Sequence, residues 1–149
     1  MIKVLMICVH NSGRSQMAEA YLQHYGGENF HVESAGFEPR SINPLVVEVM
    51  AEEGFDLSDK KPQSVFELFK AGKIFNYVVT VCSEGEDANC PIFPGLTHRL
   101  HFPFFDPAAV AGDHAEKVSS IREIRDGIKQ KMEELALMLT TSRPGSLQL

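Results

Sequence analysis

The first 25 residues constrain the fold of this chain most strongly. Residues 2–7 are mostly apolar and have the length of a buried strand, whereas residues 15–25 place Met17, Ala18 and Leu22 on one face of a helix. A strand that leads through a short loop into a helix is the building unit of a parallel α/β sheet, because parallel strands need a long crossover connection.

The rest of the chain repeats this alternation. Strands are predicted at residues 30–34 and 77–81, and a last strand includes Leu100 and Phe102. Further helices are predicted at residues 44–53, 64–71 and 116–139. The sequence therefore predicts a three-layer α/β/α domain over residues 1–139, with a central parallel sheet of about four strands. Residues 140–149 are predicted to form a flexible C-terminal tail.

The composition is that of a soluble domain. The chain has 149 residues, of which 44% are hydrophobic, and a formal net charge of −6 at pH 7. An acidic surface argues against nucleic acid or an anionic membrane as the main partner. No apolar run approaches the roughly 20 residues of a membrane-spanning helix, and the N-terminus lacks the pattern of a signal peptide. We therefore expect a cytoplasmic monomer.

Three reactive side chains are predicted to meet at one edge of the sheet. Cys8 ends the first strand, Cys82 ends the strand at residues 77–81, and Asp106 follows the last strand. The carboxyl ends of parallel strands share one edge, where ligands bind in such sheets. The chain has three cysteines, an odd number that does not suit a structural disulfide framework. The alternative is that the cysteines are small buried apolar side chains.

A cysteine and an arginine separated by five residues lie between the first strand and helix. The segment is Cys8-Val9-His10-Asn11-Ser12-Gly13-Arg14-Ser15. A tight loop before a helix N-terminus aims backbone N–H groups at one point, so residues 9–14 are predicted to bind a tetrahedral oxyanion. The same groups stabilise a thiolate at Cys8, Arg14 can bind two oxyanion oxygens, and Ser15 can donate to the sulfur. The alternative is an ordinary turn that contains these residues by chance.

These residues resemble the low-molecular-weight protein tyrosine phosphatase family, and within it the thioredoxin-coupled arsenate reductases. The segments that carry the resemblance are residues 11–19, Glu33-Ser34-Ala35-Gly36, Asn43-Pro44, residues 78–82 and Phe105-Asp106-Pro107-Ala108. Together they extend over about residues 2–139. The resemblance implies the α/β/α fold of that family, arsenate as the substrate and thioredoxin as the reductant. Phosphate or sulfate would also fit the loop.

The resemblance implies a task for each cysteine. The Cys8 thiolate attacks arsenate, and Cys82 then attacks Cys8, which releases arsenite and leaves a Cys8–Cys82 disulfide. Cys90 attacks Cys82 in turn, and thioredoxin reduces the resulting Cys82–Cys90 disulfide. The implied function is arsenic detoxification without a tightly bound cofactor.

Seven residues separate Cys82 from Cys90. In a continuous helix their Cα atoms would lie about 12 Å apart, whereas a disulfide needs about 5.5 Å. If the two pair, the segment must loop or unwind, which Gly85 and its polar neighbours allow. The alternative is a zinc site made of Cys82, Cys90, His98 and His101. Its spacing differs from that of the usual close ligand pairs.

The departing oxygen needs a proton, and the resemblance implies that Asp106 is the general acid. Asp106-Pro107 is also a common start of a turn. The next residue is Ala108, where tyrosine phosphatases of this fold usually carry tyrosine, and this difference favours a small inorganic substrate.

Two other functions remain as alternatives. A low-molecular-weight phosphatase would hydrolyse phosphate monoesters and would leave Cys82 and Cys90 without a role. A redox sensor would use these two thiols as a switch and would not turn over arsenate.

Some arsenate reductases of this family bind a potassium ion beside the loop. The residues that match the polar positions around that ion are Asn11, Ser15, Glu19 and Ser34. However, Lys61 and Gln63 occupy places where the potassium-binding members have oxygen ligands. We therefore expect the ammonium group of Lys61, or of Lys60, to take the place of the cation near Glu19. The alternative is that both lysines are solvated surface residues.

Overall fold

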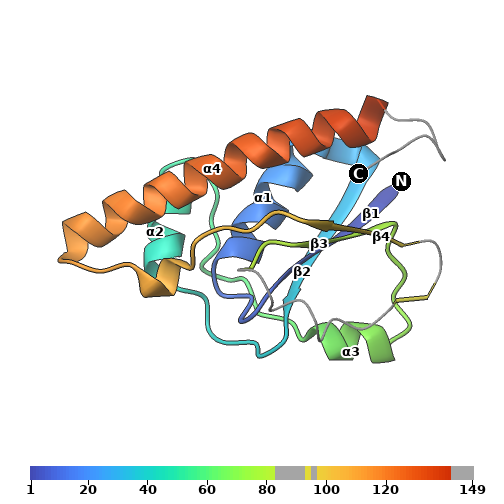
Figure 1. The fold of residues 1–149 in the computed structure, drawn as a ribbon, viewed down its shortest axis with the longest axis horizontal. Coiled ribbons are helices and arrows are strands. Elements are labelled where there is room, and N and C mark those ends of the chain that lie inside the picture. The colour runs from blue at the N-terminus through green and yellow to red at the C-terminus, as the bar shows by residue number, and fades with distance from the viewer. Residues whose placement is uncertain (83–92, 95–96, 142–149) are drawn as a thin grey trace.

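The computed structural model describes residues 1–82, 93–94 and 97–141 (Figure 1). The strands are β1 (Ile2–Cys8), β2 (Phe30–Gly36), β3 (Tyr77–Thr80) and β4 (His98–His101). The helices are α1 (Arg14–Gly26), α2 (Pro44–Ala51), α3 (Val65–Lys70) and α4 (His114–Thr141), with short 3₁₀ turns at Gly27–Asn29 and Pro107–Ala109.

The four strands form one parallel sheet in the order β2-β1-β3-β4. Helices α1, α2 and α4 cover one face and α3 lies on the other, as Figure 1 shows. The side chains of β1 alternate accordingly, with Met6 and Cys8 in the core under α1 and α4 and with Leu5 and Ile7 in the core under α3. The predicted α/β class and the parallel sheet are confirmed.

Hydrogen bonds that hydrophobic spacing does not reveal determine where helix α4 begins and ends. Helix α4 begins at His114 because the Asp113 carboxylate accepts the N–H of Glu116 at 2.8 Å. It continues through Thr141, two residues into the predicted tail, and Thr140 and Thr141 donate their hydroxyls to carbonyls of the last turns. The remainder of the predicted tail, residues 142–149, lies outside the described residues. Within the described part of the chain, no helix is both long and apolar enough to span a membrane.

Arg125 joins α4 to the end of α2. Its side chain is largely buried, and Nη1 donates to the carbonyl of Val49 at 2.9 Å and to Oε1 of Glu52 at 2.7 Å. Arg122 donates from Nη2 to Oε2 of the same carboxylate at 2.6 Å. The hydrogen bonds from Arg122, the larger influence, and from Arg125 lower the pKa of Glu52 from 4.5 to about 2.

We expect Glu52→Gln to make the stability of the fold less sensitive to acid. A carboxyl group whose pKa is lowered by folding stabilises the fold above its unfolded pKa, and this contribution disappears as the pH falls through the folded pKa. For Glu52 the window extends from 4.5 down to about 2. Urea denaturation at a series of pH values measures the effect.

The free energy of unfolding of the wild type should fall more steeply through this window than that of the variant. Glu134→Gln serves as the control, because Glu134 is an exposed residue of α4 whose only described ion pair is a 3.8 Å contact with Lys131. If the free energy of unfolding of the wild type and of Glu52→Gln fell in parallel with pH, Glu52 would not be a source of the acid sensitivity.

Candidate active site

The loop between β1 and α1 is flanked by residues 37–43, which run alongside it. Three hydrogen bonds join the two segments: Glu38 N–H to Val9 O (2.8 Å), Arg40 N–H to His10 O (3.0 Å) and Asn43 N–H to Ser12 O (2.8 Å). In a trans peptide the C=O and the following N–H point in opposite directions. Because these carbonyls face the flanking segment, the N–H groups of His10, Asn11 and Gly13 face the opposite side of the loop. The loop thus presents convergent donors, as an oxyanion site requires.

Gly36 lets β2 approach this loop closely. It pairs with Cys8 at the carboxyl ends of the two strands. A Cβ atom on Gly36 would lie 2.7 Å from the backbone N of Asn11 and 2.8 Å from the carbonyl O of Val9. Asn11 itself has a φ of 52°, in the left-handed region that asparagine tolerates better than most residues. The loop conformation therefore depends on a glycine in one strand and an asparagine in the turn.

Two hydrogen-bond donors are directed at the Cys8 sulfur. Asn11 N–H lies 3.2 Å from Sγ, and the Ser15 hydroxyl oxygen lies 2.9 Å from it. Oδ1 of Asn11 accepts the backbone N–H of Gln63 at 2.9 Å, so Nδ2 of Asn11 is turned to donate to Ser15 Oγ at 2.8 Å. With Ser15 Oγ accepting there, its own proton is available to the sulfur, and Ser15 is the donor whenever Cys8 is a thiolate, which can only accept. A buried sulfur with two such donors is suited to carry a negative charge.

A small hollow opens over Cys8. Its lining residues are Cys8, His10, Ser12, Gly13, Arg14, Asn43, Asp106, Pro107 and Ala108. The Arg14 side chain is 4% exposed, with Nη1 donating to the carbonyl of Phe104 at 3.1 Å and Nη2 lying 3.9 Å from Oδ2 of Asp106. The other Asp106 oxygen accepts Ala108 N–H at 2.9 Å. The structure thus brings together the predicted cysteine, arginine and aspartate.

The second cysteine follows the neighbouring strand. Cys82 lies just beyond β3, is fully buried, and belongs to the same core cluster as Cys8. Cys90, the third predicted cysteine, lies outside the described residues. Among residues 1–82, 93–94 and 97–141, no group of three His, Cys, Asp or Glu side chains is placed to hold a metal ion.

The polar residues predicted around a cation are already bonded to one another. Oε1 of Glu19 accepts the Ser34 hydroxyl at 2.7 Å, and Oε2 forms an ion pair with Lys60. The side chain that reaches Glu19 is therefore that of Lys60 and not that of Lys61, which the sequence favoured. Gln63, three residues after Lys60, anchors this part of the chain, because its backbone N–H binds Oδ1 of Asn11 in the loop. This anchor sets the position of Lys60. The Glu19 carboxylate is thus paired with an ammonium group and a hydroxyl group.

Sequence reasoning missed the flanking segment, residues 37–43, and the anchoring role of Gln63. Both act through backbone groups, which carry no residue-type signature. The useful signal was Gly36, two residues after the strand predicted at residues 30–34, because a glycine near a strand end indicates the close approach of another backbone segment.

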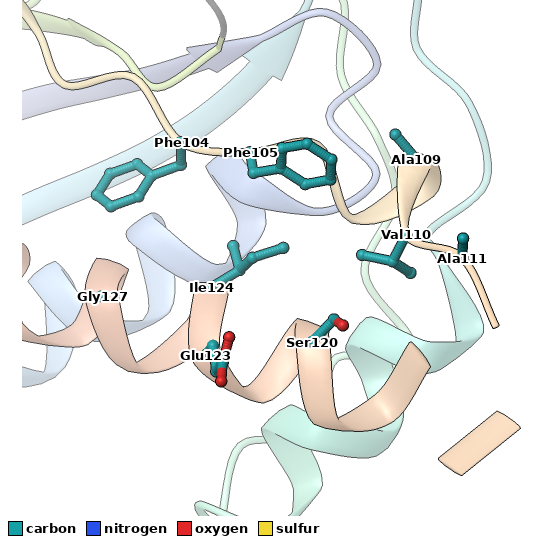
Figure 2. A pocket seen from close by; sticks show the side chains of 9 residues that line it. All are labelled: Phe104, Phe105, Ala109, Val110, Ala111, Ser120, Glu123, Ile124 and Gly127. Atoms are coloured by element: carbon teal, nitrogen blue, oxygen red, sulfur yellow. The ribbon is translucent and has the colours of Figure 1, made fainter. Parts of the chain in front are cut away.

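An apolar groove lies between α4 and the residues that precede and follow residues 106–108. Figure 2 shows the side chains that line it, among them Phe104 and Phe105 from the segment after β4 and Ile124 from α4. Its volume is about 550 Å³. Phe105, next to Asp106, is 61% exposed. A bulky organic group could thus find apolar surface near the hollow.

We expect Gly36→Ala to weaken oxyanion binding by about tenfold or more, because the new methyl group displaces the N–H groups of the loop and such overpacking costs about 1–3 kcal/mol. Isothermal titration calorimetry with inorganic phosphate measures the loss. Gly54→Ala controls for lowered stability, since Gly54 has a φ of 87° with open space around it. If Gly36→Ala and the wild type bound phosphate with equal affinity, oxyanion binding would not depend on the close approach of β2 to the loop.

Known proteins of similar sequence and structure cover nearly the whole chain. The profile of the family described as low molecular weight phosphotyrosine protein phosphatase matches residues 3–144. An arsenate reductase of Halalkalibacterium halodurans is 36% identical over 134 residues, which cover 89% of this chain and 94% of that protein. An arsenate reductase of Bacillus subtilis is 35% identical over 136 residues, with the same two coverages of 89% and 94%.

A solved structure shares the fold. A thioredoxin-dependent arsenate reductase of Corynebacterium glutamicum superposes with a TM-score of 0.74 at 35% identity. The match covers 96% of this chain and 64% of that longer chain. The family predicted from the loop and its flanking segments is confirmed by a profile that runs from β1 through α4, and this chain belongs to the low molecular weight phosphotyrosine protein phosphatase family.

Proposed function

We propose that this protein reduces arsenate to arsenite with three cysteines and is regenerated by thioredoxin. The observation that carries the proposal is the Cys8 sulfur, which receives two donors at the base of a hollow shared with Arg14 and Asp106. A second buried thiol, Cys82, follows the adjacent strand. The names of the Halalkalibacterium, Bacillus and Corynebacterium relatives support the same reaction.

The first step uses the oxyanion loop. Arsenate is a tetrahedral anion, so the N–H groups of residues 10–13 and the guanidinium of Arg14 bind its oxygens. The Cys8 thiolate attacks arsenic and forms a sulfur–arsenic bond, while one oxygen departs with a proton from Asp106. Asp106 is suited to this task because Oδ1 is held by Ala108 N–H and Oδ2 faces the hollow near Arg14.

The second step transfers two electrons. Cys82 attacks the Cys8 sulfur, the sulfur–arsenic bond breaks, and its electron pair stays on arsenic, which leaves as arsenite. Cys90 then attacks Cys82 and expels the Cys8 thiolate. Two thiols of the chain have become one disulfide, which matches the reduction of As(V) to As(III). The two thiols of thioredoxin restore the pair.

Phosphoryl-ester hydrolysis is the second candidate. The family name and the apolar groove beside Asp106 favour it, because an ester with an aromatic group could place that group against Phe105. Hydrolysis needs Cys8, Arg14 and Asp106 but neither Cys82 nor Cys90. The response of each activity to the loss of these two cysteines therefore separates the two functions.

We also propose that Lys60 replaces a potassium ion. Its ion pair with Glu19 continues through Ser34, whose carbonyl accepts Nε2 of Gln63 at 3.1 Å. Gln63 N–H in turn holds Asn11, which orients Ser15 on Cys8. A fixed ammonium group at Glu19 thus supports the active-site loop without a free cation.

We expect the three cysteine variants to separate by turnover number. Without any reductant, the wild type and Cys90→Ser should each release about one arsenite per chain, because Cys8 and Cys82 suffice for one reduction. Cys8→Ser and Cys82→Ser should release none. In arsenate-dependent NADPH oxidation with thioredoxin and thioredoxin reductase, all three variants should lose multiple turnover.

The control for this experiment is hydrolysis of para-nitrophenyl phosphate by the same proteins. Fast hydrolysis that is unaffected by Cys82→Ser and Cys90→Ser, together with no arsenite from the wild type, would show that the protein is a phosphatase instead.

We expect wild-type arsenate reduction to proceed equally well in potassium and sodium chloride at fixed ionic strength. Lys60→Met should be slower and should regain part of its rate specifically with potassium, because Glu19 then lacks a cation. Lys61→Met is the matched control and should behave as the wild type. A large potassium-specific increase in the rate of arsenate reduction by the wild type would contradict the proposal.

A further inference from the structure

Helix α3 exposes large apolar side chains on its outer face. Val65 and Leu68 of this helix are buried against the sheet, whereas Phe66 is 38% and Phe69 is 41% exposed. Ile74, shortly after the helix, is 51% exposed. We call Phe66, Phe69 and Ile74 the α3 surface. Clusters of large exposed apolar side chains commonly mark an interaction site.

The α3 surface continues into the core through aromatic contacts. Phe66 and Phe69 are one helical turn apart and so lie side by side. The ring centroid of Phe66 is 6.2 Å from that of Phe37, and the ring centroid of Phe69 is 5.7 Å from that of Phe93. Phe93 packs edge-on against the buried Phe75 at 5.5 Å. These contacts keep both exposed rings in place.

Charged side chains border this apolar patch. Glu67 and Lys70 are exposed on the same helix, and Lys73 lies 3.6 Å from the Glu33 carboxylate. Protein–protein interfaces commonly have an apolar centre and a polar rim.

The position of the α3 surface connects it to both ends of the cysteine relay. Phe37 directly follows Gly36, the residue against which the oxyanion loop packs. At the other end, Phe93 follows Cys90 by three residues, which span at most about 11 Å. A protein that attacks a disulfide at Cys90 must therefore bring its own thiol close to Phe93. Phe69 of the α3 surface contacts Phe93.

We propose that the α3 surface is the docking site for thioredoxin, an inference that rests on the proposed arsenate reductase function. The partner must present a reactive thiol next to Cys90, so its contact surface has to cover neighbouring residues. Phe66, Phe69 and Ile74 offer apolar area whose burial favours association. The rings are already ordered by Phe37 and Phe93, which limits the entropy lost on docking.

The test compares two reductants. In the double variant Phe66→Ser/Ile74→Ser we expect kcat/KM for thioredoxin to fall by about tenfold or more, as for loss of central apolar anchors. Arsenate reduction driven by dithiothreitol should be unchanged, because a small dithiol needs no docking surface. The release of about one arsenite per chain without reductant should also be unchanged, since it uses only the cysteines of the chain.

Leu137→Ser is the matched control. Leu137 is 62% exposed on α4, on the opposite face of the sheet, and should leave kcat/KM for thioredoxin as in the wild type. Phe69→Ser provides a second variant on the same surface and should also lower kcat/KM for thioredoxin selectively.

Three results would overturn the proposal. The first is an unchanged kcat/KM for thioredoxin in both α3 variants. The second is an equal loss with thioredoxin and dithiothreitol, which would assign these side chains to the fold. The third is a concentration-dependent dimer of the wild type that the double variant abolishes while kcat/KM for thioredoxin stays constant. If the wild type reduces no arsenate with either reductant and releases no arsenite, the proposed function itself fails.

Discussion

The direction of the peptide groups in the loop after β1 is the constraint on which the site depends. Three carbonyls of this loop are bound by N–H groups of residues 37–43, which leaves the N–H groups of the loop facing the Cys8 side. A loop free to rotate its peptides would present a mixture of donors and acceptors, and an anion would have to reorganise it. The flanking segment avoids that cost before any ligand arrives.

The loop is held in the same way from its other side. A chain of contacts from Lys60 and Glu19 passes through Ser34 and Gln63 to Asn11. Each contact gives a partner to a polar group that could otherwise form a hydrogen bond with the loop. Asn11 can orient the hydroxyl of Ser15 only because its own side-chain oxygen is already bound. The charge on Lys60 and the proton directed at the sulfur therefore belong to one network.

The sequence predicted the parts of the structure that repeat a local pattern. The strand and helix around Cys8 follow from hydrophobic spacing, and the parallel arrangement then places Cys82 and Asp106 at the same edge. Contacts between distant loops carry no such pattern. For that reason the sequence favoured Lys61 and kept Lys60 as the alternative at Glu19, and the bonds from residues 37–43 were not foreseen. Helix α3 has six residues, too few for its spacing to reveal that two phenylalanines face outwards.

The two faces of the sheet have different tasks in the proposed relay. Cys8 and Cys82 belong to the core under α1 and α4, whereas Phe93, close in sequence to Cys90, belongs to the core under α3. A nucleophile that must hold an arsenic ester benefits from burial, but a disulfide that must meet another protein cannot remain there. In the proposed relay the final disulfide includes Cys90, which is three residues from Phe93 in the sequence and therefore within about 11 Å of the core under α3. The proposed relay thus gives the third cysteine a role that Cys8 and Cys82, which share one buried cluster, do not fill.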